Sequence, residues 1–70
     1  MSYLEDVSAH SKSLEKRRDA LLDELKKLEE RLKKGEITEE AYKEERHRIE
    51  REIVEVMDRL AQMRFLMGRA

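Results

Sequence analysis

Lys33-Lys34-Gly35-Glu36-Ile37-Thr38 separates two charged arms of nearly equal length, both rich in leucine or isoleucine. Gly35 suits the left-handed conformation that closes a helix, because a residue without a Cβ adopts it without strain. Thr38 is a good N-cap for a second helix, and the acidic residues after it favour the positive end of the helix dipole. The stretch predicts a turn at 34–38 between helices at about 3–33 and 39–68, which is an all-α antiparallel helical hairpin.

Both arms carry apolar residues at alternating steps of three and four, the pattern of helices that pack along one side. Ser2 and Glu5 fit a capping box at the start of the first arm, and Ile37 is placed to pack on Tyr42 inside the second helix. We call the apolar positions the seam. It is predicted to contain Leu4, Val7, Leu14, Leu21, Leu25, Leu28 and Leu32 in the first arm and Tyr42, Ile49, Ile53, Val56, Leu60, Met63 and Met67 in the second.

One continuous coiled-coil helix is the alternative fold, because the same seven-residue rhythm runs through Gly35 without a change of phase. Two observations favour the hairpin. Glycine inside a helix costs about 1 kcal/mol relative to alanine. In a continuous helix Ile37 would also point to solvent.

Composition limits the kind of protein this can be. Seventy residues allow one small domain, in which a single hydrophobic core is marginally stable. The chain has no cysteine, which excludes disulfides and thiolate metal sites. It has neither a membrane-length apolar run nor a signal peptide at its start, so a cytoplasmic protein is expected. Many charged residues, with one Gln and no Asn, suggest a thermophilic source.

Charged residues are expected on the outer faces and at two places in the seam. Arg18 and Arg46 interrupt the seam, and we expect their stems to pack while their guanidinium groups reach nearby carboxylates. The alternative is that they set register or oligomeric state. Opposite charges four residues apart predict ion pairs at Asp23–Lys27, Glu29–Lys33, Glu30–Lys34, Glu39–Lys43, Glu44–Arg48 and Glu55–Arg59.

The apolar stripe is wider than a two-helix contact requires, with Leu22 and Met57 flanking it and Leu66 widening it near the C-terminus. The serine-rich start of the first helix cannot cover this surplus. The sequence therefore predicts self-association into a homodimer or larger homo-oligomer, as a four-helix bundle, with another helical protein as an alternative partner. The predicted oligomer interface consists of Ile53, Val56, Met57, Leu60, Met63, Leu66 and Met67.

The turn and its flanks resemble a known family. The leucines Leu25, Leu28 and Leu32, the Gly35-Glu36-Ile37-Thr38 turn, the pair Glu39-Glu40 and the aromatic Tyr42 are similar to the SHOCT (short C-terminal) helical motif. The resemblance covers about a third of the chain, and it implies oligomerisation rather than catalysis. The family motif is usually appended to another domain, whereas the helices here are longer.

Nucleic-acid binding is the alternative function. The hairpin resembles Rop-type RNA-binding proteins, whose dimers are four-helix bundles that contact RNA through one face. Phe65 could stack on a base, but a net charge of −1 lacks the basic excess of most nucleic-acid-binding proteins. The candidate contacts are Lys12, Lys16, Arg17, Arg59, Arg64, Phe65 and Arg69, and acidic residues lie among them.

No constellation for catalysis, cofactor binding or metal binding is predicted. Glu44 and His47 form a Glu-x-x-His pattern, which in di-iron bundles points inward. Here the pattern occurs once, and Arg46 on the seam would turn both residues toward water. His10 has no partner at helical spacing, and no nucleophile–base arrangement or phosphate-binding glycine loop can be assembled. We expect a protein that is not an enzyme.

Overall fold

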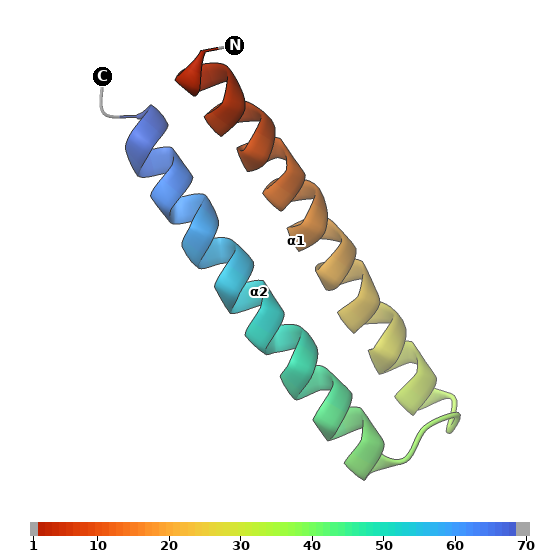
Figure 1. The fold of residues 1–70 in the computed structure, drawn as a ribbon. Coiled ribbons are helices and arrows are strands. Elements are labelled where there is room, and N and C mark those ends of the chain that lie inside the picture. The colour runs from red at the N-terminus through yellow and green to blue at the C-terminus, as the bar shows by residue number, and fades with distance from the viewer. Residues whose placement is uncertain (1, 69–70) are drawn as a thin grey trace.

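The structure, a computed structural model, describes residues 2–68 and contains two helices joined by a short turn. Helix α1 spans Tyr3–Lys33 and helix α2 spans Glu39–Met67. They lie side by side and antiparallel, so the start of α1 and the end of α2 are at the same end of the molecule (Figure 1). The hairpin is 50 Å long and 16 by 15 Å across. The predicted hairpin is confirmed, and the continuous helix is not formed.

The start of α1 is held by the predicted capping box. The Ser2 hydroxyl oxygen accepts a hydrogen bond from the Glu5 backbone N–H at 3.2 Å, and the Glu5 carboxylate accepts one from the Ser2 N–H at 3.4 Å. These bonds satisfy backbone donors that have no partner within the helix. The helix therefore begins at Tyr3 and continues through the serine-rich stretch 8–13.

The turn has the backbone geometry that glycine permits. Gly35 has φ +72°, in the left-handed region. Its N–H donates to the Leu32 carbonyl at 3.1 Å, and the Glu36 N–H donates to the Arg31 carbonyl at 2.9 Å. This pair of bonds is the Schellman motif, which ends α1. Three residues later the Thr38 hydroxyl accepts from the Ala41 N–H at 3.1 Å and starts α2.

The core is a single file of side chains between the two helices. Leu21, Ile49 and Leu60 are the most deeply buried large side chains, at 0–2% exposure. Ile37 and Tyr42 pack against the turn end of this core, where the hydrophobic staple was predicted. The buried cluster consists of Leu14, Leu21, Leu28, Ile49, Val56 and Leu60, with Leu25, Ile53 and Met63 partly buried beside it.

Two predicted seam positions differ from expectation. Leu4 is 62% exposed and Met67 is 42% exposed, although both continue the seven-residue rhythm. They lie in the terminal turns, where the opposite helix has few residues left to cover them. Arg46 is also exposed, and its guanidinium is paired with Glu50 at 3.1 Å. Arg18 is half-buried and paired with Asp19 at 3.1 Å, so both arginines direct their charge outward to a carboxylate as predicted.

A two-helix fold leaves most of its surface in solvent. Large apolar side chains on both helices are exposed, among them Leu22 and Met57. Over the described residues, neither helix has an apolar stretch of the length needed to cross a lipid bilayer. Any functional site is therefore determined by which side chains lie on each long face of the hairpin.

Candidate functional site

Helix geometry divides the hairpin into two long faces. In packed helices, residues seven apart lie in one row along the helix. The α1 row Val7, Leu14, Leu21 and Leu28 is buried along its whole length, at 0–8% exposure. Opposite it, Ile49 and Val56 of α2 are buried to 1% and 7% exposure. This buried row separates a charged face on one side from a partly apolar face on the other.

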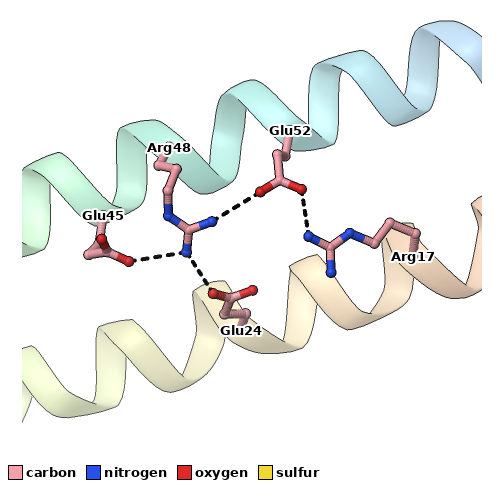
Figure 2. A network of polar contacts seen from close by, with 5 residues as sticks. All are labelled: Arg17, Glu24, Glu45, Arg48 and Glu52. Carbon is pink, nitrogen blue, oxygen red and sulfur yellow. Dashed lines mark hydrogen bonds and ion pairs between the residues drawn. The ribbon is translucent and has the colours of Figure 1, made fainter.

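The charged face carries a network of five side chains that links the two helices, and we call it the network face (Figure 2). Arg48 of α2 binds Glu24 of α1 at 2.8 Å and also contacts Glu45 at 3.1 Å and Glu52 at 3.0 Å. Glu52 in turn binds Arg17 of α1 at 2.6 Å. Two ion pairs therefore cross between the helices, on the same side of the core.

Electrostatics on the network face follow from these contacts. The hydrogen bond from Arg17, with the additional positive charge of Arg48, lowers the pKa of Glu52 below its ordinary value. The pKa of Arg48 is raised, first by its hydrogen bond to Glu24 and then by Glu45. All these side chains remain in contact with solvent, so screening limits what the network adds to stability. The charged groups of the network are therefore paired within one hairpin.

The opposite face is apolar and incompletely covered, and we call it the open face. It consists of Leu22 and Leu25 on α1 and Ile53 and Met57 on α2. At 3.6 residues per turn, Leu22 is rotated about 160° from Glu24, and Met57 about 140° from Glu52. Leu22 is 49% exposed and Met57 is 42% exposed, while Leu25 and Ile53 are partly buried. Within one hairpin, the core is therefore covered on the side of the network face, whereas the apolar side chains of the open face remain exposed to solvent.

The structure distributes the predicted oligomer-interface residues over three environments. Val56 and Leu60 are already buried within one hairpin, and Ile53 and Met63 are partly buried there. Met57 lies on the open face. Leu66, 47% exposed, shares a seven-residue row with Glu52, and it therefore lies on the network-face side. Of the predicted set, Ile53 and Met57 are the members that the open face brings together.

The predicted nucleic-acid contacts do not form one surface. Arg17 is engaged by Glu52 on the network face. Arg59 lies in the same row as Glu52, whereas Arg64 lies in the row of Met57 on the open face. Lys12 and Lys16 are exposed, four residues apart on α1, and Phe65 is 55% exposed on α2. Arg69 lies outside the described residues.

The histidines and acidic residues do not gather into a ligand set. His10, Glu44 and His47 are all exposed, which agrees with the expected outward orientation of the Glu-x-x-His pattern. Within residues 2–68, no group of three or more His, Asp or Glu side chains is arranged to hold a metal ion. His47 lines a shallow surface hollow with Glu50, Arg51 and Val54, which is open to solvent.

Sequence reasoning missed the two ion pairs that cross between the helices. It paired Arg48 with Glu44 along α2, but Arg48 turns to Glu24, Glu45 and Glu52. Of the six predicted pairs, Asp23–Lys27 at 3.1 Å is the one formed among residues 2–68. A signal was present in the sequence. Arg17 and Glu24, and likewise Glu45 and Glu52, are seven residues apart beside the seam, where charges of packed helices meet.

Comparison of the chain with protein-family models, with curated proteins and with solved structures finds no match. The resemblance of residues 25–43 to the SHOCT motif, and of the hairpin to Rop-type bundles, stays a prediction. A functional hypothesis for this chain depends on its own surface.

Proposed function

We propose that the protein is a non-enzymatic, self-associating helical module, in which two copies pack open face to open face as a four-helix bundle. The observation that supports this function is the open face itself. Leu22 and Met57 remain 49% and 42% exposed beside a core that the hairpin covers from the other side only. Burying apolar side chains such as these is the main driving force for helix association in water.

A second hairpin suits this surface in shape and chemistry. Two antiparallel helices present a long apolar stripe, and a second copy of the hairpin has a stripe of the same length. A two-fold axis lets one stripe cover an identical one. The module would then act by bringing together whatever is attached to its copies, as the resemblance to the SHOCT motif also implies.

The test of self-association is the mass in solution and its dependence on the open face. We expect light scattering at micromolar concentration to give at least twice the 8.4 kDa of one chain. Met57→Lys should shift the protein to monomers, because a charge would be buried between the copies. Val54→Lys is the matched control: Val54 is more exposed, at 66%, but lies farther round α2. A wild-type mass of one chain would overturn the proposal.

A different helical protein is the alternative partner for the same face. It would also be displaced by Met57→Lys, but the purified chain would then be monomeric. The mass measurement therefore distinguishes the two partners before any partner is known.

Nucleic-acid binding is less well supported, because the candidate cations lie on different faces and Arg17 is engaged by Glu52. Titration with mixed RNA and duplex DNA at low salt tests it directly. Binding that falls steeply with added salt would favour this function, since phosphate contacts release counterions.

A further inference from the structure

The open face has two edges, one on each helix. The α1 edge is the row Glu15, Leu22 and Glu29. The α2 edge is the row Lys43, Glu50, Met57 and Arg64. Each row has an apolar residue near its middle and charged residues beyond it.

The two edges carry opposite net charge. Glu50 is paired with Arg46 at 3.1 Å, so its charge is compensated within α2. Glu15, Glu29, Lys43 and Arg64 form no ion pair among residues 2–68. The α1 edge is thus negative and the α2 edge is positive.

The ion pairs of the network face show which residues of α1 and α2 lie at the same level, that is, at the same height along the long axis of the hairpin. Glu24 and Arg48 are in contact at 2.8 Å and therefore lie at about the same level. Glu29 is five residues nearer the turn on α1, and Lys43 is five residues nearer the turn on α2. Because both helices rise about 1.5 Å per residue, Glu29 and Lys43 are also level.

Two symmetric arrangements can cover the open face, and both make neighbouring helices antiparallel. With the turns at opposite ends, α1 of one copy lies on α1 of the other. The acidic edge then faces itself and the basic edge faces itself, whatever the register. With the turns at the same end, α1 of one copy lies on α2 of the other. The acidic edge of each copy then lies along the basic edge of the other. Glu29 is level with Lys43 of the second copy, whereas Glu15 is level with Met57.

We propose, on the premise that the open face joins two copies, that the hairpins associate with their turns at the same end. Like charges placed opposite each other disfavour an interface, whereas complementary rows select the correct orientation. The rows of opposite charge on the two edges therefore determine the direction in which the two copies run. The ends of both α2 helices would then lie at one end of the bundle, beside the starts of both α1 helices.

A distance between labels tests the orientation. The chain has no cysteine, so Glu36→Cys in the turn provides one spin-labelling site per copy. In the same-end arrangement the two labels are roughly 10–20 Å apart, because packed helices lie about 8–10 Å from each other. In the opposite-end arrangement they are separated by nearly the 50 Å length of the hairpin. Dilution with unlabelled protein should remove the signal in either case.

A second pair of sites gives the reciprocal result. With a donor dye on Glu36→Cys and an acceptor on Lys12→Cys of a different copy, the same-end arrangement separates the dyes by about 36 Å along the bundle. It should therefore give weaker energy transfer than the opposite-end arrangement, which brings the two sites closer together. Strong transfer in this pair, together with a long distance between the turns, would overturn the inferred orientation while leaving self-association intact. A monomeric mass would instead overturn self-association and this inference with it.

Discussion

The two long faces of the hairpin are built from the same two helices but are completed differently. On the network face, Arg48 and Glu52 reach across to α1 at 2.8 and 2.6 Å, and the charges are paired within one chain. On the open face, Leu22 and Met57 stay about half exposed beside a buried core. A polar surface needs only water and local partners, while an apolar surface gains by being covered. The difference between the faces is therefore the basis for the proposed association through the open face.

The largest effect should come from the buried row between the faces. Leu21→Ala should destabilise the hairpin by about 2–5 kcal/mol, since Leu21 is fully covered and its loss leaves a cavity. The neighbouring residue Leu22 is the matched control. Leu22→Ala should change unfolding of a single hairpin by less than about 0.5 kcal/mol but weaken association. Thermal denaturation at several protein concentrations separates these outcomes. Equal effects of the two substitutions would contradict the assignment of Leu21 to the core and Leu22 to the open face.

An intermediate effect on stability is expected from a substitution in the turn, which connects α1 to α2. Gly35→Ala should cost roughly 1 kcal/mol, because φ is +72° and alanine is strained there. An added Cβ would meet no atom within 4 Å, so the cost arises from the backbone conformation alone. Chemical denaturation measures it. Unchanged or greater stability in the variant would show that the left-handed turn is not retained in solution.

An effect of similar size, but from a lost hydrogen bond, is expected at the start of α2. Thr38→Ala removes the hydroxyl that accepts from the Ala41 N–H, while Thr38→Ser keeps one. Loss of an N-cap typically costs about 1 kcal/mol at exposed helix ends. Helicity and melting temperature should fall for the alanine variant and stay near wild type for the serine variant. If serine were as destabilising as alanine, the capping role would be excluded.

The smallest effect should be the pH dependence of the network face. The pKa of Glu52 is lowered in the folded state, so its contribution to stability is complete above the unfolded value of about 4.3. The contribution is lost as the pH falls below that value toward the folded pKa, because the unfolded chain takes up the proton first. Wild type should therefore exceed Glu52→Gln in melting temperature at pH 7 more than at about pH 3. Glu55→Gln is the control, since Glu55 is exposed and forms no ion pair among residues 2–68. A difference that is the same at both pH values would mean that Glu52 does not bind Arg17 in solution.

Local sequence signals predicted the fold closely. Ser2 with Glu5, Gly35, and Thr38 each act within a few residues of backbone, so their outcome depends little on the rest of the chain. The prediction of the seam was wrong at positions whose burial depends on residues far away in the sequence. Leu4 and Met67 fit the rhythm, but burial needs an opposite residue, and the terminal turns offer few. The predicted pairing of Arg48 was wrong for a related reason: its contact to Glu24 depends on which side of α1 faces α2.

By itself, the sequence determined two capped helices, the turn between them and the surplus of apolar side chains. These follow from backbone hydrogen bonding, helix periodicity and composition. Only the tertiary structure decided which side of the core is covered. Once α1 and α2 pack in one register, Arg17 and Glu24 fall on the side of Arg48 and Glu52, and Leu22 and Met57 fall on the other. That division depends on the rotation of each helix about its axis, which is set by contacts between residues far apart in the chain.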